Sequence, residues 1–220
     1  MSSTEEKSPN EQEVVAAQEV KREIIEFVKM IVWFLIVFFL VKTYVVEGYE
    51  VLGPSMNPTL QDRERILVFK LPHIVSQFQL FSGIEALRPG DIVVFDSVEP
   101  NKRYVKRVIA KGPPKAAGNT VVAQRQDAQT PEEDSVRVLF DHGKVYVNND
   151  RISEDYLRTE PKASEDVYPE VRLLPGGYYV LGDNRGVSKD SRSFGPVDDA
   201  RVVGKAILCF WPPSRIRLLK

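Results

Sequence analysis

The longest apolar stretch of the chain is an unbroken run from Met30 to Val41. With the charged residues near its ends included, the segment covers residues 24–46, and a helix needs ~20 mostly apolar residues to cross a bilayer. Lysines near the ends of such a helix can extend their amines to the lipid headgroups. The pattern predicts a transmembrane anchor at 24–46, preceded by a polar tail and the start of the helix at 1–23. We expect residues 1–18 to be disordered because they are polar and acidic.

A secretory signal peptide and a buried helix of a soluble protein are the alternatives to an anchor. Residues 42–47, which follow the run, are large and offer no small-residue cleavage site, so an uncleaved anchor is favoured. Lys21, Arg22 and Lys29 precede the run, whereas only Lys42 follows it closely. The positive-inside rule therefore predicts a single-pass protein with a cytoplasmic N-terminus and the rest of the chain outside the cytoplasm.

From Glu47 onward the pattern changes to short apolar segments separated by turns, and helical periodicity is weak. Asp141-His142-Gly143 separates two of these segments, which is typical of a β-hairpin. We expect residues 47–220 to form one mainly β domain, an antiparallel sandwich or barrel. The predicted strands are 65–69, 91–95, 103–111, 136–140, 144–148, 178–181 and 202–211.

The segments between these strands differ in character. Residues 71–84 are apolar and almost uncharged, which fits either a core segment or a segment that contacts lipid. Residues 115–134 and 158–170 are polar and contain proline, so we expect surface loops there.

Composition excludes several classes of function. The net charge is −1, and the lysines and arginines are scattered, so no nucleic-acid partner is expected. The single cysteine, Cys209, excludes an internal disulfide. Together with only two histidines, His73 and His142, it leaves the chain without the ligands of a typical zinc site. We expect neither a metal nor an organic cofactor.

A serine between two prolines, Ser55 in the stretch Gly53-Pro54-Ser55-Met56-Asn57-Pro58, is the first candidate for chemistry. A serine hydroxyl is a weak nucleophile until a neighbouring base activates it. Asn57 stands where the α/β-hydrolase elbow has a glycine, and no serine is followed by lysine three residues on, so both of those patterns fail. What remains is a serine paired with a lysine from elsewhere in the chain. The alternative is a proline-bracketed turn with an idle serine.

Lys106 is the candidate base. In the predicted strand 103–111, alternation places Lys106 on a face with Tyr104, Val108 and Ala110, which is more apolar than the face of Arg107. Burial disfavours the charged amine and lowers its pKa, and only a neutral amine accepts a proton. An ordinary surface lysine is the alternative.

A third stretch, Gly182 to Arg192, places many polar residues directly after an apolar strand. Such a cluster at a strand end is typical of a structured functional loop. The alternative is a solvated turn with local ion pairs, for example between Asp190 and Arg192. Its polar members are Asp183, Asn184, Arg185, Ser188, Asp190, Ser191 and Arg192.

These stretches together resemble the type I signal peptidases (leader peptidases), membrane serine proteases of bacteria and plastids that use a Ser-Lys dyad. The matching blocks run from about Val51 to Val197, in the same order after an N-terminal anchor. They read P-S-M-N-P-T-L, R-P-G-D-I-V-V-F, Y-V-K-R-V and G-D-N-R-x-x-S-x-D-S-R-x-x-G. The resemblance implies a mostly β catalytic domain outside the cytoplasm, which removes signal peptides from preproteins by cutting after small residues in an Ala-x-Ala-like pattern.

The resemblance also implies roles for individual residues. Ser55 matches the nucleophile, with its backbone N–H donating to the oxyanion, and Lys106 matches the general base. Ser188 matches the residue that orients the lysine, while Gly53 replaces a serine that supplies a second oxyanion donor in some members. Supporting polar positions are Asp183, Asp190 and Arg192, and the matched pocket residues are Val51, Met56, Leu60, Tyr104 and Val105.

The chain departs from the pattern of many members at residues 110–114, which differ from the usual G-L-P-G-D, and it has one evident spanning segment where some members have two. The expected partners are preprotein signal peptides and membrane lipid. The bacterial plasma membrane is the expected location, and a thylakoid membrane is the alternative.

Two other functions compete with this interpretation. One is a dedicated processing peptidase with a narrow substrate, which would use the same dyad. The other is an inert, membrane-anchored β domain that binds exported proteins. Loss of Ser55 or Lys106 would be expected in an inert relative, and both residues are present.

Overall fold

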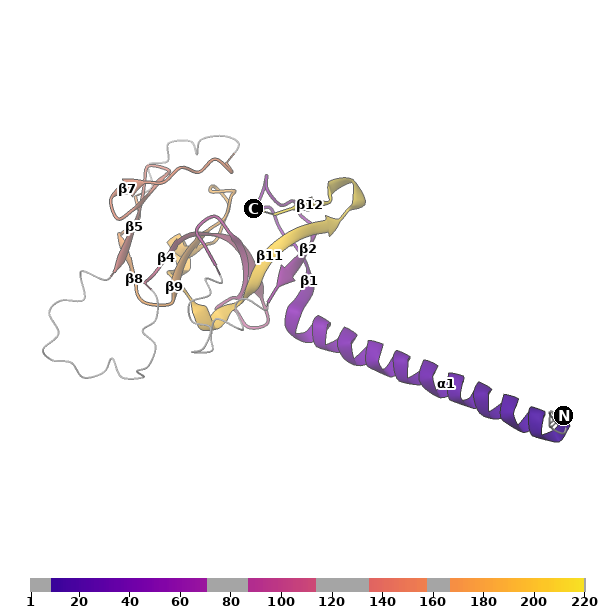
Figure 1. The fold of residues 1–220 in the computed structure, drawn as a ribbon. Coiled ribbons are helices and arrows are strands. Elements are labelled where there is room, and N and C mark those ends of the chain that lie inside the picture. The colour runs from indigo at the N-terminus through magenta and orange to yellow at the C-terminus, as the bar shows by residue number, and fades with distance from the viewer. Residues whose placement is uncertain (1–8, 71–86, 114–134, 158–166, 220) are drawn as a thin grey trace, which may run out of the picture. The chain divides into compact units, whose positions relative to one another are not determined.

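A computed structural model of the chain describes residues 9–70, 87–113, 135–157 and 167–219 (Figure 1). The chain forms two compact units, Met1–Val45 and Val46–Lys220. The first contains helix α1 (Pro9–Leu40) and a short π-helical turn (Val41–Val45). The second contains the strands.

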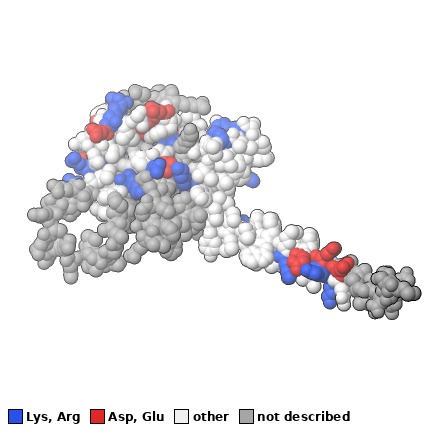
Figure 2. Space-filling view, in the orientation of Figure 1, with Lys and Arg blue, Asp and Glu red and all other residues white. Residues whose placement is uncertain are grey.

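Helix α1 is long and apolar enough to cross a membrane. The candidate span is Lys21–Val45, with a mean hydropathy of 2.6, and no residue of its most apolar part is buried against the rest of the chain. Figure 2 shows the charged side chains gathered toward the N-terminal end of the helix, followed by a stretch of uncharged residues. This helix agrees with the predicted anchor in type and position, although its bounds differ by a few residues from 24–46.

The helix begins earlier than expected. Residues 9–18 are helical, so the prediction of a disordered tail through residue 18 is wrong for this part. The segment is rich in Glu, Gln and Ala, which have good helix propensity. Pro9 suits the first turn because its missing N–H has no helical partner to lose there. Adding residues to an existing helix also avoids the cost of nucleation.

The second unit is built from antiparallel strands, so the predicted mainly β fold is confirmed. In the described residues, eight strands form one large sheet in the order β1-β2-β11-β3-β4-β9-β10, with β12 paired to β11. These strands are β1 (Val46–Glu50), β2 (Arg65–Phe69), β3 (Ile92–Asp96), β4 (Arg103–Lys111), β9 (Gly177–Leu181), β10 (Val197–Asp198), β11 (Val202–Trp211) and β12 (Arg217–Leu218).

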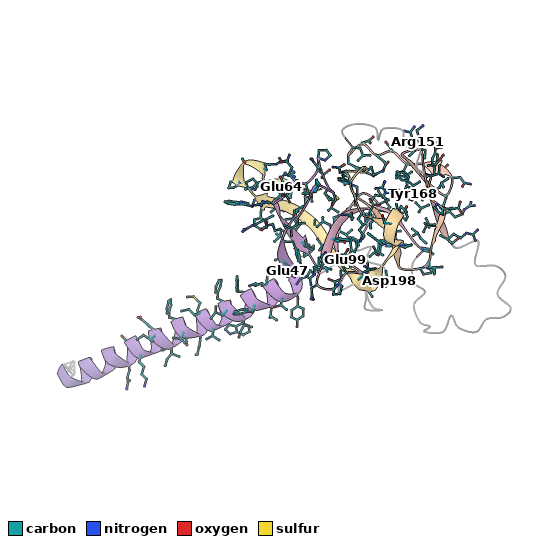
Figure 3. All side chains as sticks on the ribbon, turned by 180° about the vertical axis from the view of Figure 1, so that it is seen from behind. Glu47, Glu64, Glu99, Arg151, Tyr168 and Asp198 are labelled. Atoms are coloured by element: carbon teal, nitrogen blue, oxygen red, sulfur yellow. The ribbon has the colours of Figure 1, made fainter. Side chains whose placement is uncertain are left out.

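A smaller sheet lies beside β4 and β9 (Figure 1). Among the described residues it has four strands in the order β7-β6-β5-β8, and Figure 3 labels two residues of this part, Arg151 and Tyr168. The predicted hairpin around His142 and Gly143, both with positive φ, is confirmed as the β5–β6 connection. The four strands are β5 (Val136–Asp141), β6 (Lys144–Val147), β7 (Asp150–Arg151) and β8 (Val171–Leu173).

Short helical turns complete the unit. They are α3 (Ser191–Phe194) and the 3-10 turns Asp199–Arg201 and Pro213–Arg215. The segment 71–84 and the loop 115–134 lie outside the described residues, as do residues 158–166 of the second predicted loop. Of the remaining part of that loop, Val167 forms an isolated antiparallel bridge with Asp141.

The core lies on both faces of the large sheet. The first core cluster packs the turn after β1 against β2, β3 and β11, and the third core cluster joins β4 and β9 to the smaller sheet. The first cluster comprises Val51, Met56, Leu60, Ile66, Val68, Ile92, Val94, Ala206, Cys209 and Leu219. The second comprises Leu87, Val93, Phe95, Val108, Tyr178, Val180, Val197 and Val202. The third comprises Ile109, Ala110, Val138, Phe140, Val145, Leu173, Tyr179 and Leu181.

Strand β4 has its predicted bounds, but its faces differ from the prediction. A register shift between Val108 and Ala110 interrupts the pairing with β9, and such a bulge breaks the alternation of side chains. Ala110 therefore packs in the third core cluster, not with Val108 in the second. The prediction that Ala110 shares a face with Lys106 is wrong for this reason.

Gly204 in β11 gives a test of the packing between β2 and β11. A Cβ atom at this position would lie 2.6 Å from the Phe69 carbonyl oxygen and 3.0 Å from Val68 Cγ1. We expect Gly204→Ala to destabilise the unit by about 1–3 kcal/mol through overpacking. The midpoint of thermal unfolding, followed by circular dichroism in detergent, should fall by about 2–4 °C per kcal/mol. Gly186→Ala is the control, because a Cβ there meets nothing within 4 Å. Equal midpoints for the two variants would contradict the close approach.

Candidate active site

The turn that carries Ser55 is fixed at both ends. Val51 N donates to Glu64 O at 2.8 Å, and Arg63 N donates back to Val51 O at 2.8 Å. Within the turn, Leu60 N donates to Met56 O at 2.8 Å. Met56 and Leu60 are buried in the first core cluster. The apolar side chains that follow Ser55 therefore anchor the turn to the sheet, while Ser55 itself stays half-buried.

Lys106 reaches Ser55 from strand β4. Its Nζ lies 2.8 Å from Ser55 Oγ and donates to the Val105 carbonyl oxygen at 3.0 Å. The side chain lies near the Tyr104 ring, with Nζ 5.4 Å from the ring centroid. Lys106 is only 4% exposed. Burial lowers the pKa of its amine to about 8, against a smaller opposite effect of the carboxylates of Asp190 and Asp183.

The segment after β9 holds the backbone of the serine turn. Asn184 N donates to the Ser55 carbonyl oxygen at 3.0 Å, and Asn184 Nδ2 donates to the Pro54 carbonyl oxygen at 3.2 Å. Gly182 lies so close that a Cβ atom there would be 2.5 Å from the Ser55 carbonyl oxygen and 2.1 Å from Ser188 Oγ. Only a glycine permits this approach, so the predicted functional loop and the serine turn are in direct contact.

Asp183 forms a buried ion pair with Arg107. Arg107 Nε donates to Asp183 Oδ1 at 2.9 Å, and Arg107 Nη2 donates to Oδ2 at 2.7 Å. Both side chains are 1% exposed. Arg107 Nη1 also donates to the Gly90 carbonyl oxygen at 2.7 Å. Two parallel hydrogen bonds of this kind fix the orientation of the Asp183 carboxylate against the guanidinium as well as the distance between them.

Asp190 forms a second ion pair, with Arg192. The alternative interpretation of this stretch, a solvated turn with local ion pairs, predicted the same pair. Arg192 Nε donates to Asp190 Oδ1 at 2.8 Å, and Nη2 donates to Oδ2 at 2.9 Å. Asp190 also accepts from Gly182 N at 3.0 Å and caps helix α3. The pair is buried, so the stretch is not a solvated turn.

Ser188 lies next to these groups. Its Oγ is buried and, among the described residues, has no hydrogen-bond partner. The predicted hydrogen bond from Ser188 to the Lys106 amine is therefore not formed in this conformation. Burying a hydroxyl without a hydrogen-bond partner costs free energy. A group that formed a hydrogen bond with Ser188 Oγ would therefore stabilise the site.

The sequence comparisons agree on one family. A model of the family described as signal peptidase, peptidase S26, matches residues 24–128 and 133–211. Signal peptidase I of Bacillus licheniformis is 35% identical over an alignment of 222 positions, which covers 97% of this chain and 98% of that protein. Signal peptidase IB of Staphylococcus aureus strain COL is 32% identical over 213 residues, 90% of this chain and 95% of that protein. The chain belongs to the signal peptidase family, peptidase S26.

Among solved structures, a crystal structure of a signal peptidase I from Enterococcus faecalis V583 is similar. It is 26% identical, covers 55% of this chain and 97% of its own, and has a TM-score of 0.40. Family membership makes the protein a serine endopeptidase that removes signal peptides from preproteins. A membrane-length helix near the N-terminus of a signal peptidase indicates a membrane-anchored protein.

The other matched residues of this signal peptidase lie in the segment that carries Ser55 and on the strand that carries Lys106. Val51, Met56 and Leu60 are buried in the first core cluster, whereas Tyr104 and Val105 are partly buried on β4. Among the described residues, no group of three His, Cys, Asp or Glu side chains could hold a metal ion. Gly53, with a φ of 88° and its N–H donating to Asp62 Oδ1 at 2.7 Å, has a backbone conformation that favours glycine.

Sequence reasoning missed Arg107, which alternation placed on the less apolar face. In the structure both faces of β4 are covered, and Arg107 is 1% exposed, less than Lys106. A buried arginine requires a carboxylate partner, and Asp183 is 76 residues away in the chain. The polar stretch from Gly182 to Arg192 was a signal for such a partner, but the alternation of side chains on a strand could not show that Arg107 pairs with Asp183.

Removing Arg107 tests this buried pair. We expect Arg107→Met to lower the free energy of unfolding by about 3–5 kcal/mol, because it leaves the Asp183 carboxylate buried and unpaired. Arg103→Met is the control. It removes an exposed arginine that pairs with Asp96 and Glu47 at the surface, and we expect a loss of less than about 1 kcal/mol.

Thermal unfolding of both proteins in detergent measures the difference. A double variant, Arg107→Met with Asp183→Leu, removes both charges and should recover part of the loss. If Arg107→Met and Arg103→Met have equal unfolding midpoints, the pair does not stabilise the fold as described.

Proposed function

We propose that this signal peptidase is a single-pass membrane protein that cleaves exported preproteins after small residues, in an Ala-x-Ala-like pattern, with a Ser55–Lys106 dyad. The observation that carries the proposal is the distance of 2.8 Å between Ser55 Oγ and Lys106 Nζ. A nucleophile within hydrogen-bond reach of its base is the geometry that such catalysis needs.

The reaction follows from the state of the lysine. Neutral Lys106 takes the proton from Ser55 while the serine oxygen attacks the peptide carbonyl carbon that ends the signal sequence. The Ser55 backbone N–H donates to the oxyanion of the tetrahedral intermediate. Lys106 then protonates the leaving amine, and the C–N bond breaks. A water that gives its proton to Lys106 hydrolyses the ester and frees the serine.

The surrounding residues support the dyad. Asp183, Asp190 and Arg192 hold the segment after β9, which contacts the Ser55 backbone through Asn184. Ser188 Oγ is buried and has no hydrogen-bond partner among the described residues, so it is available to orient the lysine amine. The small-residue pockets are lined by Val51, Met56, Leu60, Tyr104 and Val105. Val51, Met56, Leu60 and Val105 lie in or beside the first core cluster and Tyr104 beside the second. This apolar setting supports the assignment, because small apolar side chains of the substrate are best bound by an apolar surface.

The anchor sets the place of the reaction. Ser55 follows Val45, the last residue of the membrane-length helix, by ten positions, which span at most ~36 Å when fully extended. With the N-terminus in the cytoplasm, the domain 47–220 meets preproteins on the other side of the bacterial plasma membrane. The charge asymmetry around the helix supports this orientation.

Single substitutions test the dyad. We expect Ser55→Ala and Lys106→Ala each to lower kcat for preprotein cleavage by about a thousandfold or more, because either loss removes the activated nucleophile. The assay uses full-length enzyme in detergent, with N-terminal sequencing of the product to find the cleaved bond. Ser153→Ala and Lys144→Ala are matched controls at exposed positions. Full activity in Lys106→Ala would exclude lysine as the base, even if Ser55→Ala were inactive.

The pH dependence tests the protonation state. Only the neutral amine of Lys106 accepts a proton, so the protonated form that dominates below its pKa of about 8 is inactive. We expect kcat/KM to rise about tenfold per pH unit below this value and to level off above it. Initial rates with one preprotein between about pH 6 and pH 10 measure the profile. A flat profile over this range would contradict the assignment.

A further inference from the structure

The segment after β7 reaches from the smaller sheet to two arginines beside the catalytic groups. Tyr156 places its ring against the guanidinium of Arg107, with Arg107 Cζ 4.1 Å from the ring centroid. Glu154 forms a nearly buried ion pair with Arg185, whose side chain is 8% exposed. Neither Glu154 nor Tyr156 is used by the reaction proposed above.

Arg107 carries the first of two connections to the serine. Its guanidinium is confined on a face by the Tyr156 ring and along its edge by both oxygens of Asp183. An aromatic ring on the face of an arginine attracts the cation without competing for its hydrogen bonds. Tyr156 thereby fixes the plane in which Arg107 holds Asp183.

Arg185 carries the second connection. Its Nε donates to the Gly182 carbonyl oxygen at 3.0 Å, and its Nη1 donates to Glu154 Oε2 at 3.1 Å. The Tyr156 hydroxyl donates to Glu154 Oε1 at 2.6 Å, and burial together with this carboxylate raises the pKa of the phenol, which stays protonated. The two connections are therefore linked to each other at Glu154 and Tyr156.

Both connections end on one stretch of backbone. Gly182 and Asp183 are held by Arg185 and Arg107, and the next residue, Asn184, donates its N–H to the Ser55 carbonyl oxygen. Ser55 and Ser188 lie so close to Gly182 that there is no room for even a Cβ atom between them, so this stretch cannot move toward either residue without displacing it. Errors of ~1 Å in such an arrangement can cost ~100-fold in rate.

We propose that Tyr156 and Glu154 are positioning residues, which hold residues 182–184 through Arg107 and Arg185 and so set Ser55 against Lys106. The inference rests on the proposed Ser55–Lys106 dyad. It assigns a catalytic task to the smaller sheet, since the segment that carries both residues begins where β7 ends.

The charges around Lys106 give this role a specific signature. The amine is influenced by the carboxylates of Asp183 and Asp190, which are paired with Arg107 and Arg192, and the ring of Tyr104 lies beside it. If Arg107 loses its support and pairs less closely with Asp183, the carboxylate acts more strongly on Lys106. The lysine then holds its proton to higher pH, and the acidic limb of the rate profile moves upward.

The test compares conservative and disruptive variants of the full-length enzyme. Tyr156→Phe keeps the ring on Arg107, whereas Tyr156→Leu removes it. Glu154→Gln keeps hydrogen-bonding atoms, whereas Glu154→Ala removes them. We expect the two disruptive variants to lower kcat about tenfold, with KM changed less than about twofold, and the conservative variants to retain most of the activity. In Tyr156→Leu, the acidic limb should also move to higher pH.

Asp155→Asn and Tyr146→Phe are the matched controls. Asp155 is exposed between the two proposed residues, and Tyr146 lies on β6 of the smaller sheet. All variants are measured well below their melting midpoints, so that loss of folding is separated from loss of rate. Unchanged kcat and pH profile in folded Tyr156→Leu and Glu154→Ala would overturn the inference.

A fall in rate that merely follows the unfolded fraction, without a shift of the pH profile, would overturn it as well. The Ser55→Ala enzyme, assayed in parallel, separates this outcome from failure of the dyad itself. An active Ser55→Ala enzyme would refute the dyad. An inactive Ser55→Ala enzyme, together with fully active Tyr156→Leu and Glu154→Ala enzymes, would refute only the positioning role.

Discussion

The exclusion of water from the Lys106 amine is the constraint on which the site depends. Moving its pKa from 10.5 to about 8 corresponds to a difference of about 3 kcal/mol between the charged and neutral forms. Because the folded value is the lower one, this term opposes folding below about pH 8 and disappears as pH rises from there to 10.5. Two carboxylates, Asp183 and Asp190, act in the opposite direction on the amine. Each is paired with its own arginine, so burial remains the dominant effect.

The fold could be predicted from the sequence where the pattern was long and regular. Strands β4 and β11 have their predicted bounds because apolar and branched residues fill them. The start of α1 at Pro9 was missed because composition described a polar tail, while helix propagation extended the apolar helix into it. The bulge after Val108 was also missed, since it depends on the pairing of β4 with β9 and no residue type marks it.

Some residues of the site could be predicted from the sequence, whereas the tertiary contacts between them could not. Ser55 and Lys106 could be named from the need of a serine for a base, and the resemblance placed the acidic partners after β9. The pairing of Arg107 with Asp183, by contrast, is a tertiary contact across 76 positions. Glu154 and Tyr156 lie in a segment with no motif of its own, and only the packing of the smaller sheet against β4 and β9 brings them to the arginines. Local sequence carries no signal for such contacts.

The contact between Asn184 and Pro54 joins positions 130 apart, and that between Lys106 and Ser55 joins positions 51 apart. Contacts over such separations stabilise the chain only after the entropy cost of closing long loops has been met. The proposed Ser55–Lys106 dyad therefore requires segments that lie far apart in the chain to come together. Strand β11, which comes late in the chain, lies between β2 and β3 in the large sheet, so the strands that flank the serine turn and the strand that carries Lys106 belong to one sheet only once β11 is in place.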